Sequence, residues 1–384
     1  MPARKVCAGL LQKAGPPVAG ELQVGLIGLT GGAETVLGAL LAEPRVRLAA
    51  VGDRDAELAA RLAESLGAEA YSDYRSLIVE RKLDALFVAA PCCDVHAYLR
   101  LAAAQGTPVW KLAPLARRFD EALTLTRVFD KAAPGGCPLV ISRAWPAEPA
   151  MEQAGKRLAE LGRPFLVEAR IFICRAEDLD WRGDSERAGS GVLLHEACAA
   201  IDTVVHWLGP PAEVYAAMSR VSRPQTRYPY DTEDTAVMVL KYADGAVASF
   251  VSCWTAGPPT YQLTIWASGG AIRIDPAKIF VLNRAGEPIC TPFDRAPNPY
   301  AHPIRAFLDG LAGDRKQLTS LGRDHLWTMA VIEAAYLSAR TGEAESPAKW
   351  FEILRAEEHL AAPEPVEGGS PTEPESAAPA EPSA

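Results

Sequence analysis

Short apolar runs alternate with amphipathic segments between Leu22 and Ser142. The runs are continuous in hydrophobicity, which is typical of short strands buried on both faces of a parallel sheet; they read LQVGLIG, VRLAAVGD, LDALFVAAP, PVWKL and PLVIS. Apolar positions at helical spacing predict helices between them, from Glu34, over 55–66, over 94–105 and over 119–132. This alternation predicts an α/β fold with right-handed crossovers.

The regular alternation of short strands and helices ends after Trp145, where longer strand patterns become frequent. We expect a long strand from Phe165 to Cys174, and helices near 148–161, over 191–207, and near 300–312 and 323–340. Two tight-turn signals, Ala243-Asp244-Gly245 and Ser268-Gly269-Gly270, each join two strand patterns, as antiparallel hairpins require. The second half is therefore predicted to be α+β with a mainly antiparallel sheet.

The length of 384 residues exceeds the size at which one hydrophobic core usually stops growing, so two domains are expected. We place an N-terminal extension at 1–20, the parallel-sheet domain at 21–145 and the second domain at 146–360. The tail 361–384 is rich in Pro, Glu, Ser and Ala and lacks periodicity. Such a segment cannot bury a core and is expected to be disordered.

Charge and cysteine usage narrow the class of protein. The net charge is −9, and the tail contributes five glutamates and no base, so nucleic acid is not an expected partner. The eight cysteines contain no C-x-x-C pair, which favours neither a zinc ribbon nor a disulfide framework, and no metal is expected. Apolar runs are too short for a membrane helix or a signal-peptide core, so a cytoplasmic location without membrane contact is predicted.

A glycine cluster follows the first apolar run, in the sequence VGLIGLTGGA from Val24 to Ala33. Asp53 follows 20 residues after Ala33, at the end of the second apolar run. This arrangement is typical of a Rossmann nucleotide site, where glycines admit a pyrophosphate and an acidic residue binds ribose hydroxyls. Of the G-x-G-x-x-G pattern only Gly28 is kept, because Thr30 and Ala33 occupy the other two positions, with Gly31 between them.

The residues after the second strand bear on the choice of cofactor. The Asp53 carboxylate favours the free 2′-hydroxyl of NAD, whereas Arg54 can accept the 2′-phosphate of NADP. We predict NAD, with NADP as the alternative. Asp53 can also be a simple turn residue before the next helix. Thr30 adds a β-branched side chain where the backbone must approach phosphate, so weakened or lost binding is a further expectation.

Several segments occur together in a family's order and spacing: VGLIGLTGG, AAVGDRDAELAARLAESLG, AYSDYRSLI, DALFVAAPCCDVHAYLRLAAAQGTPVWKLAPLA, GSGVLLHEACAAIDTVVHWLG and DTAVMVLKYADGAVASFVSCW. Over residues 22–355 the chain resembles the Gfo/Idh/MocA oxidoreductases. The resemblance implies an NAD(P)-binding domain, a second domain whose open sheet often makes oligomer contacts, and hydride transfer on sugars, cyclitols or related alcohols. It also implies that Ala90, Pro91 and His96 belong to the loop that passes under the nicotinamide ribose.

The chain departs from this family at two catalytic positions. The usual Glu-Lys-Pro reads Leu112-Ala113-Pro114, and Ala199 stands at the usual histidine, while Asp202 matches. Lys111 lies on the same strand face as Ala113, and His195 lies one predicted helical turn before Ala199, on the face of Asp202. We hypothesise that Lys111 and His195 are relocated catalytic groups; alternatively Lys111 extends from a strand end and His195 fills a polar pocket.

Two functions are consistent with these residues. In the first, the protein is an NAD(P)-dependent oxidoreductase with an atypical active site, acting on a small polyhydroxylated substrate. Lys111 then handles the substrate oxygen, and His195 with Asp202 handles the proton. In the second, Ala113 and Ala199 mark an inactive paralogue that binds a sugar or nucleotide or supports a partner in a hetero-oligomer. A homo-oligomer through the second sheet is expected in the first case.

Overall fold

The structure is a computed structural model that describes residues 21–132, 136–142, 149–175, 179–220, 230–313 and 318–353. The predicted extension 1–20 and the predicted tail 361–384 lie outside the described residues. All helices and strands named below belong to one compact unit that ends at Pro347, and residues 348–353 are a helical part of a second unit.

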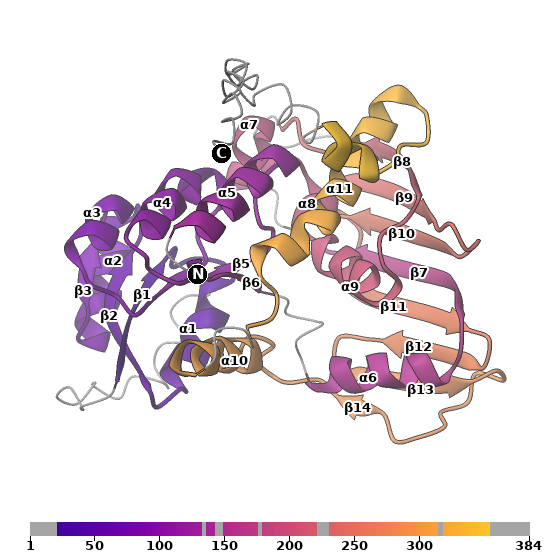
Figure 1. The fold of residues 1–384 in the computed structure, drawn as a ribbon, viewed down its shortest axis with the longest axis horizontal. Coiled ribbons are helices and arrows are strands. Elements are labelled where there is room, and N and C mark those ends of the chain that lie inside the picture. The colour runs from indigo at the N-terminus through magenta and orange to yellow at the C-terminus, as the bar shows by residue number, and fades with distance from the viewer. Residues whose placement is uncertain are drawn as a thin grey trace, which may run out of the picture. The chain divides into compact units, whose positions relative to one another are not determined.

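The N-terminal half forms a six-stranded parallel sheet in the order β3-β2-β1-β4-β5-β6, as the alternation of apolar runs predicts (Figure 1). Its strands are β1 (Leu22–Ile27), β2 (Val46–Gly52), β3 (Glu69–Tyr71), β4 (Ala85–Val88), β5 (Val109–Leu112) and β6 (Leu139–Ser142). Its helices are α1 (Ala33–Leu41), α2 (Ala56–Leu66), α3 (Tyr74–Glu80), α4 (Cys92–Ala104) and α5 (Phe119–Lys131). The short strand β3 was not predicted, because an exposed three-residue edge strand leaves no apolar run.

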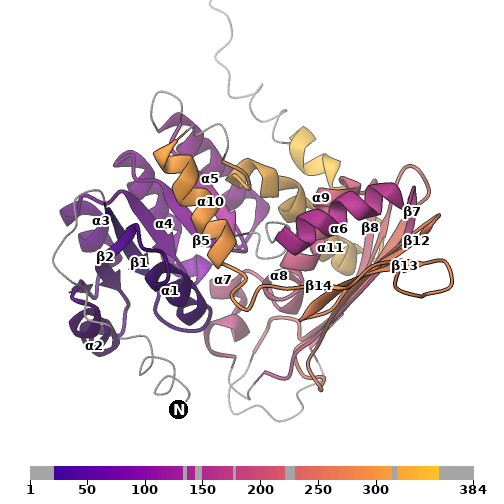
Figure 2. The ribbon, with the colours of Figure 1, turned by 90° about the horizontal axis from the view of Figure 1, so that it is seen from below.

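The C-terminal half forms an eight-stranded sheet in the order β14-β13-β12-β11-β7-β10-β9-β8. Its strands are β7 (Pro164–Phe172), β8 (Glu213–Ser219), β9 (Thr235–Lys241), β10 (Val247–Cys253), β11 (Thr260–Ala267), β12 (Gly270–Ile274), β13 (Lys278–Asn283) and β14 (Phe293–Asp294). Both predicted hairpins are confirmed, and β7 with β10 is the parallel pair in this otherwise antiparallel sheet. The helices α6 (Pro149–Glu160), α9 (Cys198–Leu208) and α11 (Leu326–Thr341) lie on one face of it (Figure 2).

The prediction of one helix over 191–207 is wrong. The segment consists of α8 (Val192–His195) and α9, and residues Ser185–His195 meet α9 at 56°. The Tyr261 hydroxyl donates to the Glu196 carbonyl at 3.2 Å, an oxygen that accepts the Ala200 amide in an uninterrupted helix. Contacts from the C-terminal sheet therefore interrupt a pattern that looks continuous in sequence. No single helix among the described residues is long and apolar enough to cross a membrane, although this bent pair passes by length and composition alone.

The helix α10 (Ala301–Ala312) packs into the core of the N-terminal sheet, although it falls within the range 146–360 predicted for the second domain. Phe307 meets Phe87 of β4 edge-on, with ring centroids 5.8 Å apart, and Tyr300 meets Trp110 of β5 at the same separation. An amphipathic pattern shows that a helix buries one face, but not which sheet that face covers.

Candidate functional site

The loop after β1 touches the loop after β4 so closely that only glycine fits at position 28. Gly28 has φ +81°, and a Cβ there would lie 2.3 Å from the Ala90 nitrogen. The Ala90 amide in turn donates to the Ile27 carbonyl at 3.1 Å. The structure therefore brings together Gly28, Ala90 and the neighbouring Pro91, which precedes the first residue of α4.

The remainder of this loop is open. Thr30, Gly31 and Gly32 are exposed, and the left-handed conformation that glycine favours falls on Gly31 (φ +64°) and not on Thr30. The backbone therefore accepts threonine at the second glycine position. Gly32 supplies no side-chain cap to α1. The Ala33 amide donates to the Thr30 carbonyl at 3.4 Å, and the next amides of the first turn are left for an acceptor outside the helix. Exposed glycines before an uncapped helix start fit the pyrophosphate of a dinucleotide.

Asp53 fastens this loop to the end of β2. It is 9% exposed, and its Oδ2 accepts the Leu29 amide at 2.7 Å while its Oδ1 accepts the Asp55 amide at 2.9 Å. Asp55, rather than Asp53, caps α2 by accepting the Glu57 and Leu58 amides. Each carboxylate oxygen has two lone pairs, so these contacts leave capacity for a ribose hydroxyl.

Arg54 reaches from the end of β2 to the start of α4. Its Nη1 lies 2.7 Å from Oδ1 of Asp94, a side chain that is 10% exposed. Because β2 and β4 flank β1 in the sheet, this ion pair crosses the end of β1. Arg187 of α7 (Ser185–Ala188) approaches the same Oδ1 at 4.0 Å. His96 lies further along α4, where burial lowers its pKa.

Lys111 is buried at the end of β5, with 2% of its surface exposed. Its Nζ donates to the Pro114 carbonyl at 2.6 Å, to the Leu112 carbonyl at 2.9 Å and to Cys92 Sγ at 3.3 Å. These acceptors match the three donors of an ammonium group. In this arrangement Lys111 ties β5 to the start of α4, and it must release one acceptor to reach a substrate oxygen.

His195 is the last residue of the short helix α8. Its Nε2 lies 3.1 Å from the Ala188 carbonyl, and because a carbonyl only accepts, the ring proton is on Nε2 and Nδ1 carries the lone pair. Burial, followed by the charge of Arg182, lowers the pKa of His195 to about 3, and Arg175 and Lys111 act in the same direction. Lys111 and His195 therefore influence each other electrostatically, and their role as relocated catalytic groups stays a prediction.

Asp202 of α9 joins a buried polar chain that sequence reasoning missed. Its Oδ1 accepts from Thr328 Oγ1 at 2.7 Å and lies 3.1 Å from His325 Nδ1. His325 Nε2 lies 3.0 Å from Ser320 Oγ, which donates to the Ile141 carbonyl at 2.7 Å. More than a hundred residues separate Asp202 from His325, so no local motif links them. This series of hydrogen bonds connects α9 with β6 through buried groups.

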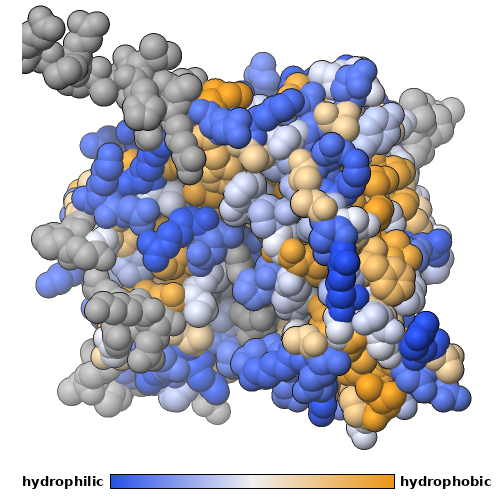
Figure 3. Space-filling view, turned by 45° about the vertical axis from the view of Figure 1, so that its right-hand side comes forward, coloured by the Kyte–Doolittle hydropathy of each residue, from blue (hydrophilic) through white to orange (hydrophobic). Residues whose placement is uncertain are grey.

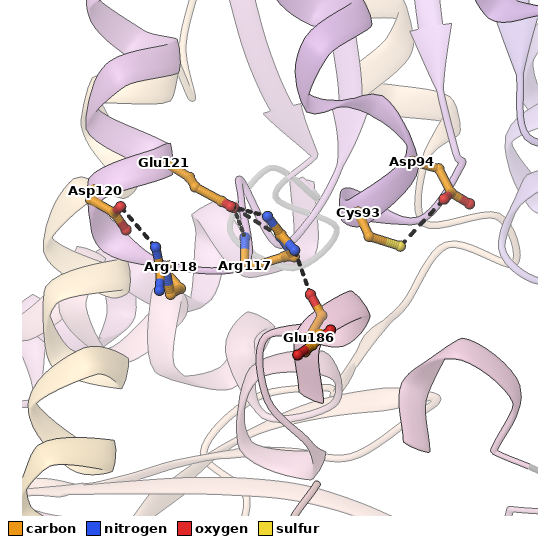
Figure 4. Close-up of polar contacts among 7 residues, drawn as sticks. All are labelled: Cys93, Asp94, Arg117, Arg118, Asp120, Glu121 and Glu186. Atoms are coloured by element: carbon orange, nitrogen blue, oxygen red, sulfur yellow. Dashed lines mark hydrogen bonds and ion pairs between the residues drawn. The ribbon is translucent and has the colours of Figure 1, made fainter. Parts of the chain in front are cut away.

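Arg117 connects the start of α5 with α7, beside the residues that position His195. Figure 4 shows its guanidinium between Glu121 and the backbone of Glu186. Nη1 donates to the Glu186 carbonyl at 2.5 Å, and Nε donates to Glu121 Oε2 at 3.2 Å. The end of the parallel sheet and the segment that carries His195 are therefore joined by a partly buried charged group.

Comparison with protein families gives two matches. Residues 22–133 match the oxidoreductase family with an NAD-binding Rossmann fold, and residues 154–273 match the GFO/IDH/MocA C-terminal domain. Together these two ranges cover more than half of the 384 residues.

Relatives match the chain over most of its length. The chain is 29% identical over 343 residues to D-xylose 1-dehydrogenase (NADP(+)) 2 of Haloferax volcanii, covering 84% of this chain and 99% of the relative. It is 25% identical to D-apiose dehydrogenase of Paraburkholderia graminis over 332 residues, 78% of this chain and 85% of that one. A solved levoglucosan dehydrogenase in complex with NADH and levoglucosan has the same fold, with a TM-score of 0.73, 22% identity, and coverage of 85% of this chain and 99% of that one.

Proposed function

Because this chain belongs to the Gfo/Idh/MocA oxidoreductase family, we propose that it is an NAD(P)-dependent oxidoreductase that acts on a sugar or related polyol through an atypical active site. The observation that carries the proposal is the glycine loop with its Asp53 anchor, which fits a dinucleotide. The relatives named above are a D-xylose, a D-apiose and a levoglucosan dehydrogenase. NAD(P), when bound, supplies the hydride chemistry, and the protein supplies orientation and proton transfer.

In this proposal His195 accepts the proton of the reacting hydroxyl. Its Nε2–H is held by the Ala188 carbonyl, so Nδ1 is the basic atom. A pKa of about 3 leaves the ring unprotonated but weakly basic at neutral pH, so this role requires a bound ligand that raises the pKa. His195 Nδ1 would accept the hydroxyl proton, and the hydride would pass from the carbon that bears this hydroxyl to the oxidised NAD(P), when bound. Lys111 acts as a positioning residue that holds β5 against α4, and Asp202 holds α9 through Thr328 and His325.

The test separates binding from turnover. Calorimetric titration with NAD, NADH, NADP and NADPH is expected to give micromolar or tighter binding of one pair. His195→Ala should keep that affinity while turnover falls about 10²- to 10⁴-fold, the range for losing a general base. His206→Gln, at an exposed position of α9, is the control and should keep turnover. Full turnover in His195→Ala would remove this histidine from the mechanism.

A binding subunit without turnover is the second candidate function. Ala113 and Ala199 stand at the positions that the family resemblance makes catalytic, and the three donors of Lys111 are engaged by protein acceptors. Cofactor binding without hydride transfer on D-xylose, D-apiose or levoglucosan would favour this candidate. No binding at millimolar cofactor would contradict the oxidoreductase function and leave a repurposed scaffold that binds a sugar or supports a partner subunit.

We also propose that the protein forms a homo-oligomer through the open face of the C-terminal sheet. Alternate residues of neighbouring strands leave Tyr215, Val237, Val239 and Val247 exposed there, and Figure 3 shows apolar surface on that side of the molecule. Glu213 and Lys241 on the same strands provide both charge signs, as a self-complementary surface needs. A second copy is therefore the partner that this face fits.

A further inference from the structure

Arg182 lies beside the proposed base, in the short 3-10 helix η2 (Asp180–Gly183). Its guanidinium carbon stands 4.5 Å from the centre of the Trp181 ring. The same ring meets the His195 imidazole edge-on, with centroids 5.1 Å apart and an angle of 87° between the planes. Trp181 therefore contacts both the guanidinium and the imidazole, and the charge of Arg182 acts on His195.

The arginines around Arg182 differ from it in one respect, because each of them has a carboxylate partner. Arg175 pairs with Glu196, Arg117 with Glu121, and Arg54 with Asp94. Within the described ranges, no carboxylate lies at ion-pair distance from the Arg182 guanidinium, whose close contact is the Trp181 ring. Burial lowers the pKa of Arg182 against the opposing effect of Asp180. A partly desolvated cation that makes no ion pair with the described residues is an unfavourable arrangement that an incoming anion would relieve.

A second cation increases this local excess of positive charge. Lys111 is buried against two carbonyls and a thiol, and none of these acceptors is a carboxylate. Arg182, Arg175 and Lys111 all lower the pKa of His195. An anion that neutralises Arg182 would raise the pKa of His195 towards its ordinary range and make the imidazole a stronger base.

We propose that Arg182 binds an anionic group of the substrate, a carboxylate or a phosphate carried by the sugar, and so directs the reacting hydroxyl towards His195. The substrate class is then a sugar acid or sugar phosphate, whereas the names of the two dehydrogenase relatives are those of neutral sugars. A guanidinium matches either group because its parallel N–H donors bind two oxygens at once. The sugar part of this inference rests on the proposed function, but the anion site does not.

Calorimetry on the protein without cofactor tests the site directly. D-galacturonate, D-xylonate and D-glucose 6-phosphate are compared with D-galactose, D-xylose and D-glucose. At least one charged compound should bind about 10-fold or more tightly than its neutral counterpart, and the carboxylate and phosphate members show which anion is preferred. Arg182→Gln should weaken that binding about 10- to 100-fold, the loss expected for a charge-assisted hydrogen bond. The affinity of Arg182→Lys should lie between those of the wild type and Arg182→Gln, because lysine keeps the positive charge but lacks the paired N–H donors of a guanidinium.

The controls separate this site from the cofactor site and from general damage. Arg157→Gln removes an exposed, ion-paired arginine of α6 and should leave all affinities unchanged. Arg182→Gln should also leave NAD(P) affinity and thermal stability unchanged. Weaker cofactor binding in Arg182→Gln, equal binding of charged and neutral members, or no binding of any member would overturn the proposal. A charged compound that binds through Arg182 without hydride transfer would contradict the proposed function and leave the anion site standing.

Discussion

The glycine loop after β1 and the junction of α8 with α9 both carry site residues predicted from the sequence, and they differ in what fixes their backbone. The loop is set by its own glycines and by neighbours that every parallel sheet of this topology brings together. The junction is set by contacts with distant strands, including the Tyr261 hydroxyl on the Glu196 carbonyl. The backbone of a loop set by sheet topology can therefore be predicted from the sequence, whereas the surroundings of a side chain placed by a broken helix cannot.

The two ends of α8 show how far this dependence extends. At its start, the Glu233 carboxylate accepts the Gly191 amide at 2.7 Å and the Leu193 amide at 3.0 Å, and Tyr336 donates to it at 2.6 Å. At its end, His195 is bound to the Ala188 carbonyl. The orientation of the proposed base is thus shared among residues from several parts of the chain.

The largest effect is expected at Gly28. Gly28→Ala places a Cβ 2.3 Å from the Ala90 nitrogen in a left-handed conformation, so we expect a loss of about 3 to 5 kcal/mol of stability, from overpacking and backbone strain. Gly31→Ala is the matched control, because no atom lies within 4 Å of its Cβ, and only the strain of about 1 to 2 kcal/mol remains. Urea unfolding measures both. Equal losses would show that contact between the two loops does not constrain this turn.

The next effect is expected at Glu233. Glu233→Ala leaves the Gly191 and Leu193 amides and the Tyr336 hydroxyl without their acceptor, which costs about 2 to 3 kcal/mol. Glu233→Gln keeps one carbonyl oxygen and should lose less. Unfolding free energies are compared with amide hydrogen exchange over 191–196, which should accelerate most in Glu233→Ala. Unchanged exchange in that segment would mean that α8 is held by other contacts.

The same residue gives a pH dependence. Burial raises the folded-state pKa of Glu233 above its ordinary value of 4.5, so the folded state retains this proton at a pH where the unfolded chain has lost it. The contribution of Glu233 to stability is therefore present at low pH and declines as pH rises from 4.5 through the raised pKa. Denaturant unfolding across this range should show that decline in the wild type and not in Glu233→Gln. An identical pH slope in both proteins would exclude Glu233 as its source.

A smaller effect, on affinity rather than folding, is expected at Asp53. Asp53→Asn replaces one acceptor oxygen by a donor that faces the Leu29 or Asp55 amide, which loosens the loop and should weaken NAD(P) binding about 10-fold. Asp55→Asn is the control, because it changes the cap of α2 without touching the loop. Calorimetry compares the two. Similar losses of affinity in both variants would mean that the turn as a whole, and not Asp53, sets the site.

Substitutions on the open face of the C-terminal sheet are expected to affect the glycine loop and the α8–α9 junction least. Val239→Glu places a charge in the exposed apolar row and should dissociate the proposed homo-oligomer without changing cofactor affinity. Ile289→Glu is the matched control, an exposed apolar residue outside the strands of that row. Light scattering after size exclusion gives the mass of each variant. A wild-type monomer, or an unchanged mass in Val239→Glu, would contradict this interface.

The sequence by itself determined the N-terminal parallel sheet, the mainly antiparallel C-terminal sheet and the position of the glycine loop, because apolar periodicity and turn residues are local properties. The glycine pattern and the acidic spacing also singled out Gly28 and Asp53, and the family resemblance added Ala90; the structure shows Gly28 against Ala90 and Asp53 bound to the same loop.

Only the tertiary structure decided the surroundings of the other candidate residues. The contact of Lys111 with Cys92, the Ala188 carbonyl on His195 and the hydrogen-bonded series from Asp202 to Ser320 join groups that no periodicity relates. The charge imbalance at Arg182 likewise depends on tertiary contacts, because the neighbouring Arg175 has a carboxylate partner whereas the Arg182 guanidinium lies over the Trp181 ring. Local pattern records which face a residue prefers, whereas hydrogen bonds and charge balance depend on which distant groups folding brings to that face.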